Sequence, residues 1–343
     1  MNLQLLSSLC NASGISGFED DIQAVVIEVL KESCDETWRD RLGNVIGLKR
    51  ASASTAGAGR VPRVVLAAHS DEIGMMVKHI GPEGFIHFAP VGGIQAAAIT
   101  SQLVTIHGRK PIRGVIVPVV GTETTPPVLE ELQIDLGLPY DEVCELVQVG
   151  DPITFAQELV QLNSNVYMSR NFDDRLGTYC LLEAMKRVGP TQVDVYAVST
   201  VQEEVGVRGA PVAAFAIEPD IGIAIDGSLC RGAGAWTKPH ERTCELGEGT
   251  GIYVMDRLTM GDRRLVKFLV DLCKQHEIPF QRNVGGGTDA SAIQRNKTGA
   301  LVTTIGAPVR YMHSTVSLCH EDDVEATIAL LTTFLERAHE MLG

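Results

Sequence analysis

Two adjacent carboxylates, Glu203 and Glu204, stand at the end of an apolar stretch, residues 193–201, that predicts a buried strand. A carboxylate that leaves water costs several kcal/mol unless it is paired or bound to a cation. An ordinary pair of solvated surface charges therefore fits poorly at this position. The two glutamates indicate a metal site.

Residues of metal-binding type also follow other predicted strands. His69 comes directly after the apolar run 64–68, and Asp226 comes directly after the run 221–225. Because open α/β sheets bind ligands at the carboxyl ends of their strands, we expect both side chains to meet the paired glutamates. Asp71 has the spacing of a carboxylate that orients a metal-bound imidazole two residues away. A His-x-Asp triplet alone more often belongs to a surface loop than to a metal site. It supports a metal site here only because other residues of metal-binding type follow neighbouring strands.

Asp173 and His313 are weaker candidates when each is taken alone. Asp173, Asp174 and Arg175 begin a predicted helix, where aspartates are common in the cap and first turn whatever the function. His313 follows the predicted strand 300–305 and a short loop, and a single histidine there is more often structural than a ligand. Asp173 and His313 are therefore proposed as metal ligands only because the other candidate ligands are present.

The candidates together have the composition of a two-metal site. Such a site needs an imidazole and a carboxylate for each of two cations, with a further carboxylate bridging both. Asp173 could bridge, and either Glu204 or Asp226 could complete either pair, which leaves Glu203 free to act as a base. Neighbouring residues of an extended segment point in opposite directions, so we expect a bend at the two glutamates. The candidate ligands are His69, Asp173, Glu204, Asp226 and His313.

Composition excludes some classes of partner. The 343 residues include 29 basic and 43 acidic side chains, a net charge of −14, which argues against nucleic acid and anionic membranes as partners. The sequence shows neither the pattern of a signal peptide nor a membrane-spanning apolar run, and its eight cysteines form no CxxC pair. We therefore expect a cytoplasmic protein with free thiols.

The pattern of apolar residues predicts two regions of different texture. Helices and strands alternate near the beginning of the chain and again after about residue 165, which is typical of an α/β domain. Between them, short apolar runs cut by glycine and proline predict a small, inserted β-rich domain. The uncharged stretch 51–59 is interpreted as a flexible hairpin excursion rather than a linker. Predicted helices cover 20–33, 175–188, 261–276 and 321–341, and predicted strands cover 44–48, 64–68, 193–201, 221–225 and 300–305.

Six short motifs, in their order along the chain, resemble those of the M42 family of metallo-aminopeptidases. The family includes TET-type and glutamyl aminopeptidases, and some members have been labelled endoglucanase M. The resemblance extends over nearly the whole chain, although Arg170 stands in a segment where a lysine is common in the family. The motifs are AHSDEIG at 68–74, FDDR at 172–175, QEEVGVRGA at 202–210, AID at 224–226, GGGTDA at 285–290 and MHS at 312–314.

The resemblance implies an α/β fold of phosphorylase/hydrolase type with an inserted small β-barrel. The catalytic metallopeptidase domain would be discontinuous, comprising residues 1–72 and 165–343. Residues 73–164 would form a β-rich dimerisation domain. Members of the family commonly assemble as tetrahedral homododecamers built from dimers, so the resemblance implies a homo-oligomer of this kind.

The resemblance also implies roles for the candidate residues. Two divalent cations per subunit, zinc or cobalt first and manganese as a further candidate, would be bound by the five candidate ligands. Asp173 would bridge the two cations. Glu203 would be the general base, and Asp71 would orient His69. The turns 248–251 and 285–290 would lie near the substrate.

These roles imply removal of the N-terminal residue from short peptides that have a free N-terminus. Glu203 would take the proton of a water whose pKa the cations lower, and would pass it to the leaving amine. Two alternatives are a glycoside hydrolase, since paired carboxylates also cleave glycosidic bonds, and a noncatalytic assembly protein stabilised by metal. Aromatic residues make up 5% of the chain, which argues against sugar stacking. The complete ligand set beside Glu203 argues against a noncatalytic role.

Overall fold

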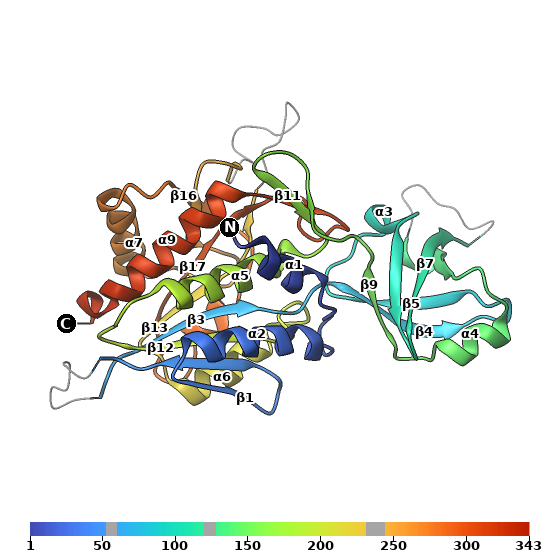
Figure 1. Cartoon of the computed structure of the whole chain (residues 1–343), viewed down its shortest axis with the longest axis horizontal. Helices are drawn as coiled ribbons and strands as arrows, with labels where there is room; N and C mark the ends of the chain where they lie inside the picture. Colours follow the sequence, from blue (N-terminus) through green and yellow to red (C-terminus); the bar gives the residue numbers. More distant parts are fainter. Residues whose placement is uncertain (53–59, 120–127, 231–243, 343) are drawn as a thin grey trace.

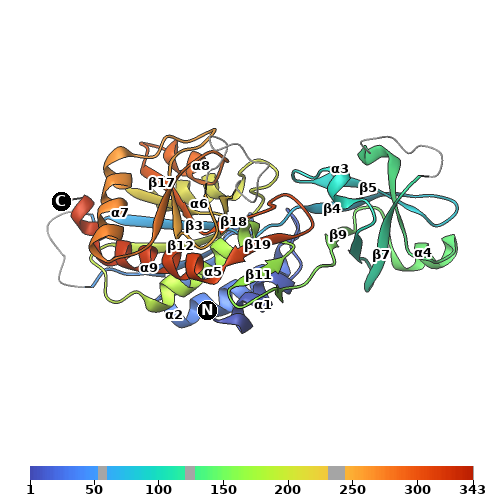
Figure 2. The same cartoon turned by 90° about the horizontal axis from the view of Figure 1, so that it is seen from above.

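The computed structural model describes residues 1–52, 60–119, 128–230 and 244–342, and Figure 1 draws the remaining segments in grey. Two bodies lie side by side in both views: a larger α/β body and a smaller body made by the inserted strands (Figures 1 and 2). The stretch 51–59, interpreted as an excursion, lies almost entirely outside the described residues. Within the described ranges, no helix is long and apolar enough to cross a membrane.

The α/β body is built around one eight-stranded sheet. In chain order its strands are β1 (Glu36–Arg39), β2 (Val45–Lys49), β3 (Arg63–His69), β12 (Asp194–Thr200), β13 (Ile221–Ile225), β15 (Thr250–Met255), β16 (Phe280–Val284) and β17 (Leu301–Gly306). They lie in the order β1-β2-β12-β3-β13-β17-β15-β16, and the four central strands run parallel. The continuous apolar runs of β3 and β13 are buried, as expected where helices cover both faces of a sheet.

Helices cover both faces of this sheet. They are α1 (Leu3–Asn11), α2 (Asp20–Ser33), α5 (Phe172–Arg187), α6 (Gly209–Ile217), α7 (Arg263–Gln275), α8 (Ala290–Gln294) and α9 (Glu321–Arg337). Val64, Leu66 and Ala68 of β3 join the core formed with α1, α2, α5, α7 and α9, whereas Val65 and Ala67 join the core formed with α6 and α8. This alternation follows from the two-residue repeat of a strand. Figure 2 shows α6 and α8 on the opposite side of the sheet from α5 and α9.

The smaller body is a closed barrel with its own apolar core. Its strands are β4 (Gly74–Ile80), β5 (Ile86–Val91), β6 (Leu103–His107), β7 (Pro111–Pro118), β8 (Leu132–Asp135) and β9 (Pro152–Phe155), closed in the order β4-β5-β8-β7-β6-β9. Short helices, α3 (Ala96–Ile99), η2 (Leu129–Glu131) and α4 (Tyr140–Leu146), lie between them. Inward side chains such as Met75, Val104 and Ile153 are buried in a core separate from those of the α/β body. The predicted α/β fold with an inserted β-barrel is confirmed.

Two small sheets complete the α/β body. One contains β10 (Val160–Gln161), β11 (Val166–Ser169) and β19 (Ser317–His320), and the other pairs β14 (Ser228–Leu229) with β18 (Pro308–Val309). The first sheet follows the barrel in the chain and joins the segment before α5 to the segment before α9. It therefore fixes the position of the start of α5, which carries Asp173, and of the loop before β19, which carries His313.

The predicted helices and strands of the α/β body agree with the structure where the periodicity of apolar residues is strong. The predicted helix 20–33 is α2, and the predicted strand 221–225 is β13. The helix α5 begins at Phe172, but the next two residues have non-helical backbone angles, so regular helix starts near the predicted residue, Arg175. The predicted helix 321–341 is divided into α9 and a 3-10 turn, η4 (Ala338–Met341). The alanine-rich α6 was not predicted, because it lacks an apolar stripe of clear period.

A buried ion pair joins the end of β3 to the start of α5. The carboxylate of Glu72 accepts hydrogen bonds from Arg170 Nε at 2.8 Å and from Arg175 Nη2 at 3.2 Å. Arg175 also donates to the carbonyl oxygens of Leu9 and Ala12 at the end of α1. All three charged side chains are buried, so one carboxylate is shared by two guanidinium groups and holds three segments together.

Replacing Glu72 with glutamine should therefore destabilise the fold strongly. The variant leaves two buried guanidinium groups without a carboxylate, and breaking a buried pair in this way lowers the free energy of unfolding by about 3–5 kcal/mol. Urea denaturation of the purified protein measures the change. Glu36→Gln, which breaks an exposed pair with Arg50, is the matched control and should have little effect. Equal, small effects of the two substitutions would contradict the assigned role of Glu72.

Candidate metal centre

The parallel strands bring the candidate ligands to one edge of the sheet. His69 is the last residue of β3 and lies level with Thr200, the last residue of β12, while Asp226 directly follows β13. The first turn of α5 supplies Asp173. The predicted site residues that line one cavity of ≈ 630 Å³ are His69, Asp173, Glu203, Glu204, Asp226 and His313.

Asp173 lies between two imidazoles. Its Oδ1 is 3.1 Å from Nε2 of His69, and its Oδ2 is 3.5 Å from Nε2 of His313. Ligand atoms of His69, Asp173 and Glu204 all lie within 4.8 Å of one another. A carboxylate whose two oxygens face different imidazoles has the arrangement needed to bridge two cations.

Both imidazoles are anchored through Nδ1 by a backbone carbonyl. Nδ1 of His69 lies 3.1 Å from the carbonyl oxygen of Asp71, and Nδ1 of His313 lies 3.1 Å from that of Gly93. A proton donated from Nδ1 to a carbonyl leaves the lone pair on Nε2, which makes Nε2 the ligand atom. Gly93 lies two residues after the end of β5, so the inserted body orients one of the candidate ligands.

The carboxylates are crowded in a partly dehydrated cavity. Burial, together with the nearby Asp173, raises the pKa of Glu204 well above its usual value. Burial, together with Asp174 and Asp173, has the same effect on the pKa of Asp226. Burial raises the pKa of Glu203 to about 8. Because a nearby cation would stabilise the charged forms of these groups, the donor set fits divalent metal ions.

Asp71 contacts more than the histidine it was predicted to orient. Its carboxylate lies 3.5 Å from Nδ1 of His69, farther than its own carbonyl oxygen. The same carboxylate accepts the backbone N–H groups of Glu203 at 3.0 Å and of Glu204 at 3.1 Å, and the hydroxyl of Ser16 at 2.6 Å. The expected bend at the two glutamates is present, and Asp71 holds it.

Glu19 completes this bend and was missed by the sequence analysis. Its carboxylate accepts the N–H of Gln202 at 3.0 Å and that of Gly17 at 2.9 Å. Three consecutive amides, at residues 202–204, are therefore bound by two buried carboxylates. An acidic residue at the start of a helix is common, so Glu19 before α2 gave no distinctive signal in the sequence.

The two predicted pocket turns lie in different places. Three residues of the 285–290 turn line the cavity, and its Asp289 accepts a hydrogen bond of 2.5 Å from the hydroxyl of Thr200. None of the described cavity residues comes from the 248–251 turn. That turn and the residue before it face the start of α9, where Asp323 accepts backbone amides of Gly247 and Gly249.

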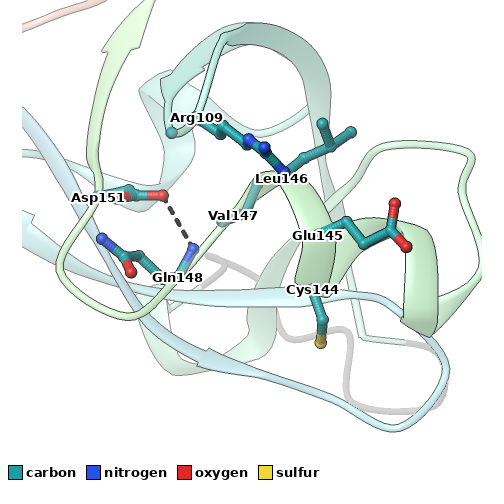
Figure 3. A pocket seen from close by; sticks show the side chains of 8 residues that line it. Arg109, Cys144, Glu145, Leu146, Val147, Gln148 and Asp151 are labelled. Carbon is teal, nitrogen blue, oxygen red and sulfur yellow. Dashed lines mark hydrogen bonds between the residues drawn. The ribbon is translucent and has the colours of Figure 1, made fainter.

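A second cavity, of ≈ 370 Å³, lies in the barrel beside α4 (Figure 3). Asp151 accepts the backbone N–H of Gln148 at 2.9 Å there, and the side chains of Cys144 and Glu145 point away from Asp151. Arg109 also lines this cavity. Its described side chains do not converge as metal ligands would, and none of the predicted site residues lines it.

Comparison with known proteins decides the family of this chain. The family model described as M42 glutamyl aminopeptidase matches residues 43–330. The chain belongs to the M42 aminopeptidase family. The predicted resemblance is therefore confirmed, and with it the enzyme class: the chain is an aminopeptidase, a hydrolase of peptide bonds.

Relatives of this M42 aminopeptidase align over nearly its full length. A lysyl aminopeptidase of Pyrococcus furiosus is 32% identical over 98% of both chains. The solved structure of the aminopeptidase APDkam598 from Desulfurococcus kamchatkensis is 34% identical, with a TM-score of 0.92 over 97% of this chain and 94% of that one. A Pyrococcus horikoshii TET1 peptidase, described as able to assemble into a tetrahedron or a large octahedral shell, is 29% identical, with a TM-score of 0.84 over 97% and 98% of the two chains.

Metal binding by this M42 aminopeptidase should strengthen as the pH rises. In the metal-free protein burial and the neighbouring carboxylates raise the pKa values of Glu204 and Asp226, which favours their protonated forms, and a cation competes with those protons. Isothermal titration with Co²⁺ or Mn²⁺ should therefore give tighter binding at about pH 8 than at about pH 6. Buffers of different ionisation enthalpy should reveal net proton release. Binding independent of pH, without proton release, would show that the carboxylates are already ionised.

Proposed function

We propose that this chain removes the N-terminal residue from short peptides with a free N-terminus, using two divalent cations. The membership of the M42 family establishes the aminopeptidase class. The observation that carries the finer proposal is Asp173, whose two oxygens face His69 and His313 in a cavity that Glu203 also lines. The proposed ligands are His69, Asp173, Glu204, Asp226 and His313.

The ligand chemistry restricts the metals. Imidazole nitrogen and carboxylate oxygen suit zinc and cobalt, with manganese as a further candidate. When bound, two such cations would polarise the scissile carbonyl group and lower the pKa of the attacking water. The carbonyl groups of Asp71 and Gly93 support this ligation, because they hold both imidazoles with Nε2 facing Asp173.

Glu203 is the proposed general base. It lines the same cavity as the five proposed ligands, which already supply an imidazole and a carboxylate for each cation and a bridging carboxylate, so the carboxylate of Glu203 is assigned to proton transfer. Burial raises its pKa to about 8, and the positive charge of bound cations would bring that pKa down towards neutrality. A carboxylate of this kind takes the proton of the attacking water and returns it to the leaving amine. The amides bound by Asp71 and Glu19 keep Glu203 and Glu204 directed at one cavity.

Assembly and location are proposed on separate grounds. The M42 membership and the assembly described for the TET1 relative support a homo-oligomer, and we propose a tetrahedral homododecamer built from dimers. The division into residues 1–72 and 165–343, and a dimerisation role for residues 73–164, remain predictions. The cytoplasmic location also remains a prediction from composition.

The glycoside-hydrolase alternative receives little support from the cavity. Sugar-binding sites commonly stack a ring against an aromatic face, because the apolar sides of sugar and aromatic rings fit together. Among the described residues that line the cavity, Tyr253 is the one phenylalanine, tyrosine or tryptophan, and its side chain is almost fully buried. The described lining of the cavity therefore offers no open aromatic face for a sugar.

Cleavage should require both metal and a free amino terminus. The chelated protein, restored with zinc, cobalt or manganese, should release the first residue from aminoacyl chromogenic substrates and short peptides, because the proposed cations polarise the scissile carbonyl. N-acetylated copies of the same peptides should resist cleavage. Cleavage of blocked peptides, or hydrolysis of a β-glucan that survives chelation, would contradict the proposal.

Glu203→Gln should abolish turnover without removing the metals. The amide cannot accept a proton, and loss of general acid–base catalysis typically lowers the rate by about 10²–10⁴. Steady-state kinetics and metal analysis of the same preparation measure both effects. Glu204→Gln is the matched control, because it removes a proposed ligand and should lower the metal content as well. Wild-type rates in Glu203→Gln with both metals in place would exclude Glu203 as the base.

A further inference from the structure

Two buried cysteines, Cys230 and Cys244, are in contact beside the strand that follows Asp226. The thiol of Cys230 donates to the carbonyl oxygen of Cys244 at 3.0 Å, and the two residues are 6% and 1% exposed. Both are free thiols in the structure. Burial raises the pKa of Cys244 to about 12, and the nearby Cys230 contributes to this rise. The two sulfurs therefore lie close enough for the charge of one to act on the other.

Groups that favour a negatively charged sulfur lie beside Cys230. Burial raises the pKa of Cys230, but the guanidinium group of Arg310 and the backbone N–H of Leu246 act in the opposite direction. The Nε of Arg310 is buried and, within the described part of the chain, has no hydrogen-bond partner. A buried donor without an acceptor is costly, and a thiolate or a sulfenate at Cys230 would supply the acceptor. Cys230 is therefore the sulfur that should react first.

The two cysteines lie next to the segments that carry two of the proposed metal ligands. Cys230 comes four residues after Asp226, and its backbone N–H donates to the carbonyl oxygen of Val309 at 3.0 Å. Arg310 follows directly and stands three residues before His313. Movement of Cys230 would therefore disturb β14 and β18, the paired strands next to these two ligands.

We propose that Cys230 and Cys244 form a reversible disulfide when the protein is exposed to hydrogen peroxide, and that this disulfide lowers the activity of the enzyme. In a reducing compartment, disulfides are usually transient and redox-sensing, which agrees with thiols that are free at rest. Since the sulfur of Cys230 already touches the backbone of Cys244, rotation of the Cys244 side chain about its Cα–Cβ bond is the movement that a bond between the sulfurs requires. The effect on activity rests on the proposed aminopeptidase function, whereas formation of the disulfide does not.

The reaction consumes one peroxide for each disulfide. The thiolate of Cys230 attacks one oxygen of hydrogen peroxide, so that an S–O bond forms, the O–O bond breaks, and the departing hydroxide takes up a proton to become water. The sulfur of Cys244 then attacks the sulfenic acid at Cys230. An S–S bond forms, the S–O bond breaks, and the hydroxyl group leaves with the Cys244 proton as a second water. The two thiols together lose two electrons and two protons.

Peptide mass spectrometry of the zinc-loaded enzyme tests the disulfide directly. Trypsin separates the two cysteines, because Cys230 falls in peptide 209–231 and Cys244 in peptide 243–257, each without a further cysteine. After peroxide treatment and blocking of the remaining thiols, the two peptides should be found joined, and dithiothreitol should separate them. In the same samples, kcat/KM for an aminoacyl p-nitroanilide should fall by at least about threefold and recover on reduction, because small displacements of catalytic groups cost up to about 10²-fold.

Cys230→Ser and Cys244→Ser should each abolish the joined peptides and make the activity insensitive to the disulfide-forming treatment. Arg310→Gln should slow the joining about threefold, because a thiol pKa raised by about one unit lowers the thiolate fraction but increases the nucleophilicity of the thiolate that remains. Cys144→Ser is the matched control, because Cys144 is an exposed thiol in the barrel. It should change neither the joined peptides nor the loss of activity.

The outcomes separate this proposal from the proposed function. If the two peptides stay separate while the exposed Cys144 of the same sample is oxidised, the disulfide is overturned. If the peptides are joined and kcat/KM is unchanged, the effect on activity is overturned. If the reduced wild type cleaves no aminoacyl substrate, the aminopeptidase proposal fails instead, and the joined peptides still decide whether the disulfide forms.

Discussion

The crowding of carboxylates at one edge of the sheet is the constraint on which the site depends. Within the described residues, neither Glu204 nor Asp226 has an arginine or lysine partner, and burial raises the pKa of both groups. Glu72, three residues after His69 in the chain, is instead bound to two buried arginines. Glu72 is thus a structural carboxylate, because its charge is paired with arginine inside the fold. Glu204 and Asp226 lack such a partner, and a divalent cation would stabilise their charged forms.

The fold also uses carboxylates to shape the backbone that carries this chemistry. Asp71 and Glu19 bind the amides of residues 202–204, and this pairing turns the chain where β12 ends. A proposed ligand and the proposed base can then stand next to each other in the sequence and still face the same cavity. In an extended strand they would face opposite sides. Local backbone geometry therefore converts two adjacent glutamates into groups with two different roles.

The inserted body contributes directly to the cavity. It enters the chain just after Asp71 and Glu72, at the carboxyl edge where β3 ends. Gly93, which follows β5, holds His313 through its carbonyl oxygen, and Gly93 also lines the cavity with Gln95. The wall of the α/β body carries Arg257. Segments of both bodies thus line the cavity. Because the smaller body is inserted at the carboxyl edge of the sheet, it can supply part of the cavity wall and orient His313.

The sequence by itself determined the types of side chain and the strand ends at which they occur. His69, Glu204 and Asp226 follow apolar runs that are local features of the sequence, and local patterns were sufficient to predict an α/β domain with an inserted β-rich domain. That the inserted domain is a barrel followed from the resemblance to the M42 family. Only the tertiary structure decided which groups meet. The contact of Asp173 with both imidazoles depends on the parallel order of strands far apart in the chain. The same is true of Glu19, which lies 183 residues from its partner Gln202, because a contact at such a separation leaves no periodic trace in the sequence.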